Sequence, residues 1–368
     1  MIFNVNCSYI SEKRGIDLAF NNNINDIIKK VLFPSAFIFP FVLSMGACSG
    51  IGALWSCIIT VILTVFVDKF DKKNLLFVLL NFTVISYLLN SFGYVSAVIA
   101  LAVSGIVFCF GNKFSSVILK IKESPAFAGL MLATALTVTV LQTTNYFGIG
   151  ATGNTPREMI ESYVSLGFHG NWRGVLYGTI VLVIMITYPR KFKKFSKIIH
   201  ASFFALIITV VLNYFLNPPD MITSINEISA LEFNRSLSTN ITVWGVIISI
   251  ICGIIIAFSN ELILLNNNLE RKDFLKIGIT NIILAPALCF VPQKINKSAV
   301  KNIPIAALMV LFLFLIKDVI IRIPVHSCAV VLIVGAWQAV DWKSFKKAFK
   351  NPASVFIFLL PVALFLLY

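Results

Sequence analysis

Long apolar stretches separated by short polar loops run through almost the whole sequence. They cover residues 31–48, 51–67, 74–90, 93–111, 125–144, 172–189, 199–217, 242–265, 275–291, 303–321, 325–340 and 353–368. Each is close to the roughly 20 residues that a helix needs to cross a bilayer. Because 58% of the residues are hydrophobic and 12% are charged, the composition excludes a water-soluble globular protein. The sequence therefore predicts an all-α, polytopic integral membrane protein.

One polar segment, PQKINKSAVKN at 292–302, interrupts this apolar pattern. A polar break at membrane depth is tolerated where it is buried in protein or lines a water-filled cavity. Lys294, Lys297 and Lys301 are spaced by three and four residues, so they would share one face of a short helix. A half-helix at 294–302 would also present free N–H groups to an anion and would bring the passes to about 13. We interpret the segment as an anion site; the alternative is a cytoplasmic loop with solvated lysines.

The basic residues fall in alternate loops, which indicates the orientation because short cytoplasmic loops are rich in Lys and Arg. One set of loops holds 22 of the 30 basic residues, at 13–30, 69–73, 113–122, 190–197, 271–276 and 343–350. The opposite loops, 145–172 and 217–241, contain Arg157 and Arg235 in their interiors. We therefore expect a cytoplasmic amino-terminal segment at 1–25, with no cleavable signal peptide, and a multi-pass protein of the bacterial inner (plasma) membrane.

Glu261 lies well inside an apolar stretch, IICGIIIAFSNELILL. An ionised carboxylate is costly in such surroundings unless a cation is close. The sequence therefore predicts that Glu261 carries a proton or acts as a counter-ion, which is a coupling role. The alternative is that it lies near the cytoplasmic end of the span and reaches water beside the asparagines at 266–268.

The sequence lacks the patterns that are typical of other classes of protein. The net charge of +14 could suggest nucleic acid, but the basic residues form clusters at membrane edges rather than one face interleaved with aromatic residues. The seven cysteines lie mostly inside spans without CxxC spacing and are interpreted as small packing residues. The three histidines are scattered, which is typical of surface or edge positions. We expect no catalytic residue, metal site, cofactor or nucleic-acid partner.

Several segments carry a family resemblance through their order and spacing. They are PFVLSMGACSG at 40–50, ESPAFAGL at 123–130 followed by Gln142 and Phe147-Gly148, Glu261-Leu262, Gly278 with Asn281, NKSAV at 296–300, and IPVHSCAVVLIVGAWQAVDWKSFKKAF at 323–349. Together they resemble the sulfate permease (SulP) anion transporters, the family that includes prestin, over about residues 26–365. The NKSAV segment is similar to the S-R-S-A-V that begins the family's tenth helix, where the substrate anion binds.

This resemblance implies an inverted repeat of seven plus seven helices with half-helices, a gate domain, and a core domain that moves an anion between two sides. The repeats would span about 26–217 and, incompletely, 242–368. The substrate would be a small inorganic or carboxylate anion such as sulfate, coupled to protons or sodium in symport, with a homodimer as a further expectation. On this match the substrate-binding residues are Asn296, Lys297, Ser298, Phe41 and Ser44, with Lys297 replacing the family's arginine, and Glu261 is the coupling residue.

The chain also departs from the family pattern. The third span, NLLFVLLNFTVISYLLN, lacks the Gly-Pro-Thr stretch that breaks the helix in relatives, so Asn81 and Thr83 are its polar candidates. Phe41 stands where many relatives have glutamine, and Asn302-Ile-Pro304 replaces a Gly-rich, Thr-containing segment. On this match the chain stops within the thirteenth helix, without a fourteenth or the regulatory STAS domain.

Three rival functions follow from other features. A degenerate, non-transporting membrane component is favoured by the missing helix. A membrane enzyme acting on lipid-linked sugars would use the loop at 145–172, which contains Arg157, Glu158, Glu161 and His169, with Arg173 just beyond it. That loop also reads as an amphipathic surface segment, TPREMIESYVSL, with Met159, Ile160 and Tyr163 on one side. A nucleobase carrier would need a second carboxylate where the tenth helix is basic.

Overall fold

The structure is a computed structural model that places most of the expected helices. It describes residues 39–41, 43–44, 72–114, 116, 118, 120–121, 124–151, 153, 155–197, 199–216, 242–264, 271–288, 303, 307, 310–311, 315, 317–320, 322–349 and 352–367. Within these ranges every regular element is helical. The expectation of an all-α polytopic protein is confirmed.

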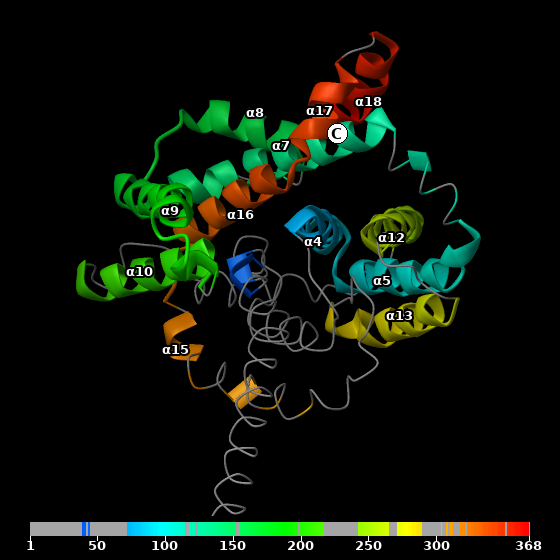
Figure 1. Ribbon diagram of the computed structural model, residues 1–368, viewed down its shortest axis with the longest axis horizontal. Helices are drawn as coiled ribbons and strands as arrows, with labels where there is room; N and C mark the ends of the chain where they lie inside the picture. The colour runs from blue at the N-terminus through cyan, green and yellow to red at the C-terminus, as the bar shows by residue number, and fades with distance from the viewer. Residues whose placement is uncertain are drawn as a thin grey trace, which may run out of the picture.

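The long helices form two groups (Figure 1). The first contains α4 (Lys72–Phe92), α5 (Tyr94–Cys109), α12 (Val243–Leu264) and α13 (Arg271–Leu284). The second contains α7 (Pro125–Phe147), α9 (Trp172–Lys191), α10 (Ala201–Leu216), α16 (Val325–Ala339) and α18 (Pro352–Leu367). Helix α4 joins the groups by packing on α16 and α7. Each group draws helices from both halves of the chain, as interleaved repeats do.

Shorter elements connect these helices. They are η2 (Gly111–Lys113), α8 (Pro156–Leu166), η3 (Phe195–Lys197), η4 (Ala285–Ala287), α15 (Lys317–Ile320) and α17 (Trp342–Ala348).

The ends of α7 and α9 follow from their local sequences. Pro125 occupies the first turn of α7, where its missing N–H costs nothing, and Gly148 ends the helix in the left-handed region with φ 63°. Asn171 caps α9, because its Oδ1 accepts hydrogen bonds from the backbone N–H groups of Arg173 at 3.1 Å and Gly174 at 3.4 Å. The residues Gly148 and Asn171 thus set where two neighbouring helices of the second group meet.

Helices α5 and α13 approach each other closely through two glycines. A Cβ on Gly105 would lie 2.7 Å from the carbonyl oxygen of Gly278, and a Cβ on Gly278 would lie 2.6 Å from that of Gly105. Small residues at such crossings allow the backbones of membrane helices to touch. Dispersion contacts then hold the helices together, because the hydrophobic effect does not drive helix association within lipid. This contact fixes α13 against the end of α5, close to Glu261.

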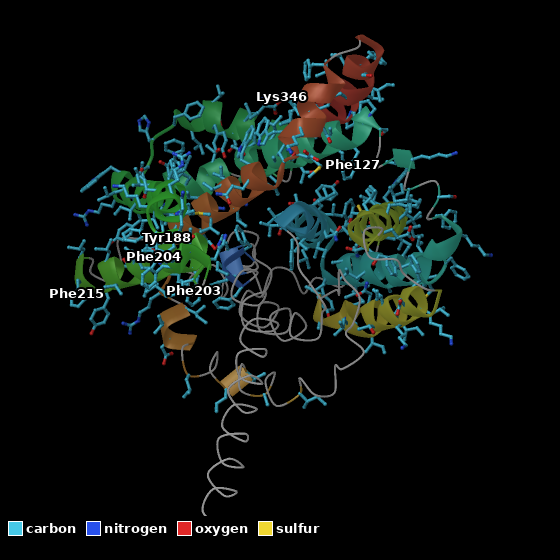
Figure 2. All side chains as sticks on the ribbon, viewed as in Figure 1. Phe127, Tyr188, Phe203, Phe204, Phe215 and Lys346 are labelled. Atoms are coloured by element: carbon cyan, nitrogen blue, oxygen red, sulfur yellow. The ribbon has the colours of Figure 1, made fainter. Side chains whose placement is uncertain are left out.

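Large apolar side chains cover the outside of the helices, as expected for a surface that faces lipid. Phe215 is 76% exposed and points away from the bundle (Figure 2), whereas Tyr188 and Phe204 stack inside at a ring-centroid distance of 4.6 Å. Among the described residues, three helices have the length and composition to cross a membrane, namely 125–147, 172–191 and 243–262, and five shorter apolar helices accompany them. The predicted spans at 31–48, 51–67 and 303–321 fall largely outside the described residues.

The amphipathic segment of the outer loop forms α8, but one of its predicted contacts is wrong. Met159 and Tyr163 are buried beside Val140 and Leu141, whereas Ile160 is 45% exposed. Met159 and Tyr163 are four residues apart and lie on one face of the helix, while Ile160 is rotated by about 100° from Met159. The buried face of α8 is therefore narrower than the sequence suggested.

Candidate functional site

Glu261 lies in the last turns of α12 and is buried, with 1% of its surface exposed. Its carboxyl group packs against Gly111 of η2, just after α5, where any side chain would collide with it, and beside Phe274 of α13. Neither Oε1 nor Oε2 accepts a hydrogen bond from a described residue. Glu261 thus lies near the end of its span, as the alternative has it, but its side chain is buried and not exposed to water.

Charged residues lie on the elements around Glu261 without pairing with it. Lys113 of η2 is exposed, with its Nζ 6.0 Å from the ring of Phe110. Lys272 and Lys276 of α13 are also exposed, and Asp273 lies between them. Within the described ranges no ion pair reaches the carboxyl group. Since a buried carboxylate without a counter-ion is strongly destabilising, this position favours a neutral acid or a bound cation.

Two residues that precede Glu261 form a buried polar cluster with α4. Asn81 of α4 donates from Nδ2 to Oδ1 of Asn260 at 2.7 Å. The Oδ1 of Asn81 accepts from the hydroxyl of Ser259, which also lies 2.9 Å from the carbonyl oxygen of Ile256. Asn81 and Asn260 are fully buried and Ser259 is 3% exposed. The cluster ties the two helices together at the level of the carboxyl group.

Helix α4 is continuous through the position where relatives are expected to break. It runs without interruption from Lys72 to Phe92, in agreement with the missing Gly-Pro-Thr stretch. Of the two polar candidates in this span, Thr83 donates to the carbonyl oxygen of Leu79 on its own helix at 2.8 Å. Asn81 is the candidate that reaches another helix.

Phe41 and Ser44 lie against the second group of helices. The ring of Phe41 is 1% exposed, covers Gly335 of α16 and lies 5.9 Å from the imidazole of His200. The fully buried Ser44 neighbours the thiol of Cys328, although its Oγ makes no hydrogen bond of normal geometry to a described residue. These two predicted substrate contacts therefore flank α16.

The remaining predicted substrate contacts, Asn296, Lys297 and Ser298, lie outside the described residues. The described part of the predicted site thus consists of Phe41, Ser44 and Glu261. Their roles in binding and coupling stay predictions.

His326 contradicts the prediction that the histidines are surface or edge residues. It is 2% exposed in the first turn of α16, and its Nδ1 lies 3.2 Å from the carbonyl oxygen of Tyr146. Its Nε2 has no partner among the described residues. The ring fills the space between Gly148 and Gly174, so it acts as a packing group between three helices.

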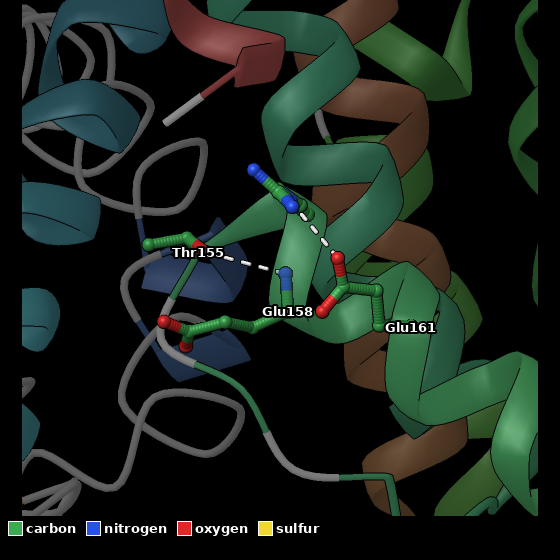
Figure 3. Close-up of polar contacts among 4 residues, drawn as sticks. Thr155, Glu158 and Glu161 are labelled. Carbon is green, nitrogen blue, oxygen red and sulfur yellow. Dashed lines mark hydrogen bonds and ion pairs between the residues drawn. The ribbon is translucent and has the colours of Figure 1, made fainter.

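The charged residues of the outer loop have local structural roles (Figure 3). Thr155 caps α8 by accepting from the backbone N–H of Glu158 at 3.3 Å, and Arg157 Nε donates to Glu161 Oε1 at 2.9 Å. The hydrogen bond from Arg157 and the charge of Glu161 raise the pKa of Arg157. The guanidinium of Arg173 lies over the ring of Trp172. These contacts are local to α8 and to the start of α9.

Ser259, Asn260 and Gly111 are the residues of this site that the sequence interpretation missed. The signal was present in the pair Ser-Asn directly before Glu261, because three successive polar residues are unusual within an apolar span. Gly111 carries no such signal, since its importance comes from the close approach of α12.

Comparisons with known proteins show which solved structures have a similar fold. No family model matches the chain, and no curated protein matches its sequence. The transmembrane domain of the cyanobacterium bicarbonate transporter BicA is similar with a TM-score of 0.60 and 14% identity, over 94% of this chain and 96% of that one. SLC26A9 is similar with a TM-score of 0.58 and 11% identity, over 92% of this chain and 61% of that one.

The first of these two solved structures is the membrane domain of a bicarbonate transporter. The likeness of both structures to this chain covers more than nine tenths of its length. The chain therefore shares the all-α fold of these two solved structures.

Proposed function

We propose that this protein is a secondary active transporter of a small inorganic or carboxylate anion and that it works by alternating access. The substrate class includes bicarbonate, sulfate and dicarboxylates, and a proton or sodium ion is carried in symport. The observation that carries the proposal is Glu261, a buried carboxyl group without a described partner, in a fold shared with a bicarbonate transporter.

The division of the helices supports this mechanism. Helices α4, α5, α12 and α13 pack on one another, and α7, α9, α10, α16 and α18 form the other group. Alternating access requires two such bodies that rock against each other around a binding site. In this proposal the first group carries Glu261 and moves as the core, and the second group acts as the gate.

Within this mechanism Glu261 couples transport to the cation. A carboxyl group in apolar surroundings is stable when it is protonated or when a cation neutralises it. The core can therefore move through the membrane while the charge of Glu261 is compensated. Its contact with Gly111 and Phe274 leaves little room for water on that side. Loss of the proton or the sodium ion would expose an uncompensated charge and so oppose movement of the core without its cargo.

The anion is assigned to the amino end of the predicted half-helix at 294–302. Asn296, Lys297 and Ser298 provide a charge and two polar side chains, and Phe41 and Ser44 complete the site from the first span. Lysine binds an oxyanion as a point charge, whereas arginine offers a planar pair of donors. We therefore expect Lys297 to bind sulfate less tightly than an arginine would, which the Lys297→Arg variant tests.

The proposed setting is the inner (plasma) membrane of a bacterium, with the amino terminus in the cytoplasm. It rests on the alternation of basic loops, which also predicts that α9 ends in the cytoplasm, where Arg190 and Lys191 form its last turn. Labelling of single cysteines introduced at the ends of α9 in intact cells would test this orientation.

The experiment that tests the function is uptake of labelled sulfate, bicarbonate and succinate into proteoliposomes, with and without gradients of pH and sodium. The native chain is compared with Lys297→Ala and Glu261→Gln. We expect uptake of at least one anion by the native protein, its loss in Lys297→Ala, and uptake by Glu261→Gln that no longer responds to the gradient. Absence of uptake of all three anions by a folded native protein would favour a non-transporting component instead.

A further inference from the structure

Three atoms with unmet hydrogen-bonding capacity lie on two successive residues of α12. They are Nδ2 of Asn260 and the two carboxyl oxygens of Glu261, and none has a partner among the described residues. Both side chains are buried, at 0% and 1% exposed. Glu261 already has a role in the proposed function, whereas the amino group of Asn260 does not.

The orientation of Asn260 follows from its contact with α4. Its Oδ1 accepts from Asn81 Nδ2 at 2.7 Å. Asn81 is itself held by the hydroxyl of Ser259, which donates to its Oδ1. Because oxygen and nitrogen are opposite branches of one carboxamide, an oxygen engaged by Asn81 leaves the amino group directed elsewhere. Asn81 and Ser259 thus hold Asn260 with two free N–H donors.

A buried donor without an acceptor has an energetic cost that a leucine at this position would avoid. The rest of α12 is strongly apolar, VWGVIISIICGIIIAF before the polar triplet. Its other buried serine, Ser249, satisfies its hydroxyl within the helix by donating to the carbonyl oxygen of Gly245 at 2.6 Å. Asn260 and Glu261 are therefore exceptions within the described part of α12. The unmet donor of Asn260 points to an acceptor that comes from outside the helix bundle.

We propose that Asn260 donates a hydrogen bond to the transported anion and that Asn81 is the positioning residue that directs its amino group. This inference rests on the proposed function and adds a described residue to those that bind the anion. The continuous helix α4 offers no amino end to an anion here, and a side-chain amide fixed by α4 supplies donors in its place. A neutral donor next to Glu261 binds the anion without burying a second charge.

The test measures binding of labelled sulfate, bicarbonate and succinate to the purified full chain in lipid nanodiscs, so that it does not depend on transport. The variants are Asn260→Ala, which removes the donor, and Asn260→Asp, which has nearly the same shape but presents oxygens. Ser249→Ala is the matched control, because it removes a buried polar group from the same helix. The melting temperature of each variant reports whether it is folded.

We expect Asn260→Ala to weaken binding roughly 10- to 100-fold, as for the loss of a hydrogen bond to a charged group. Asn260→Asp weakens it further, because a carboxylate repels the anion, and Ser249→Ala binds like the native protein. Asn81→Ala weakens binding in the native background but has no additional effect in Asn260→Ala, since the two residues act through one amide. A purely structural role for Asn81 would instead give additive losses.

Two results overturn the proposal. If the folded Asn260→Ala and Asn260→Asp variants bind anions like the native chain, Asn260 does not contact the anion, while the proposed function stands. If Asn260→Asp instead strengthens binding that depends on sodium, the oxygen of the amide faces a cation and the donor assignment is wrong. A native chain that binds none of the three anions contradicts the proposed function itself.

Discussion

The imidazole ring of His326 occupies the space that a side chain on Gly174 would need. A Cβ on Gly174 would overlap the ring, and a Cβ on Gly148 would lie 2.7 Å from its Cε1. The ring is also held by the carbonyl oxygen of Tyr146 at 3.2 Å. The two glycines and the histidine therefore form one packing unit that joins α7, α9 and α16.

The first prediction concerns this unit. Gly174→Ala forces the buried ring of His326 to move, and overpacking of this kind costs about 1–3 kcal/mol. We expect a lower melting temperature of the purified protein in detergent. Gly150→Ala is the control, because nothing lies within 4 Å of a Cβ at Gly150. Equal melting temperatures for the two variants would mean that the ring can shift freely.

The second prediction concerns the contact between Gly111 and Glu261. A methyl group on Gly111 would displace the carboxyl group of Glu261 from its place beside Phe274. Since misplacing a reacting group lowers rates steeply, we expect gradient-driven uptake by Gly111→Ala to fall on the order of 10-fold or more. Uptake without a gradient, measured in the same proteoliposomes, separates loss of coupling from loss of folding. Native coupling in a folded Gly111→Ala protein would contradict the assigned role of the contact.

Glu261→Gln separates the coupling role from a structural one. Glutamine has nearly the same shape and removes a buried carboxyl group that no described cation compensates. We therefore expect the variant to be at least as stable as the native protein in thermal unfolding at neutral pH, although it no longer couples. A melting temperature several degrees lower would indicate that the carboxylate has a structural cation partner.

These particular residues show how far the sequence predicts the structure. The sequence predicts the helices at 125–144, 172–189 and 242–265 within a few residues, because apolar length marks all three locally and Pro125 and Gly148 bound the first. The sequence also shows directly that Glu261 is a carboxylate within an apolar stretch. In contrast, the contact of Asn260 with Asn81 joins residues that are 179 positions apart, and no local pattern encodes such a pairing.

Ile160 and His326 show a second reason why the sequence predicts the structure only in part. Whether a residue on a short amphipathic helix is buried depends on which neighbour that helix meets, and α8 meets α7 along a narrow stripe that leaves Ile160 exposed. His326 is buried because two glycines from different helices leave room for its ring. Both outcomes are properties of tertiary packing, which the spacing of single residues does not contain.

The fourth prediction concerns Tyr163, which docks α8 on α7. Its hydroxyl donates to the carbonyl oxygen of Val140 at 2.8 Å, and burial raises its pKa above the ordinary value near 10. The contribution of Tyr163 to docking is thus complete below about pH 10 and is lost as the pH rises through the raised pKa of the folded state. Tyr163→Phe removes the hydrogen bond, at a cost of about 1 kcal/mol, together with this alkaline loss.

Limited proteolysis of the loop around α8 at neutral and alkaline pH measures this effect. The native loop should become sensitive only at alkaline pH, whereas Tyr163→Phe should be slightly more sensitive at both values and change little between them. Ser165→Ala is the control, because the hydroxyl of Ser165 is exposed and bonds to its own helix. Alkaline sensitivity of Tyr163→Phe equal to that of the native chain would assign the effect to another group.

The central claim is that the protein carries anions by alternating access. Counterflow tests this claim directly, because a carrier loaded with unlabelled anion inside proteoliposomes draws in labelled anion against its concentration, whereas a channel or an inactive protein does not. With sulfate, bicarbonate or succinate inside, we predict transient accumulation of the same labelled anion by the native chain. Accumulation no greater than in protein-free liposomes, for all three anions, would contradict the account.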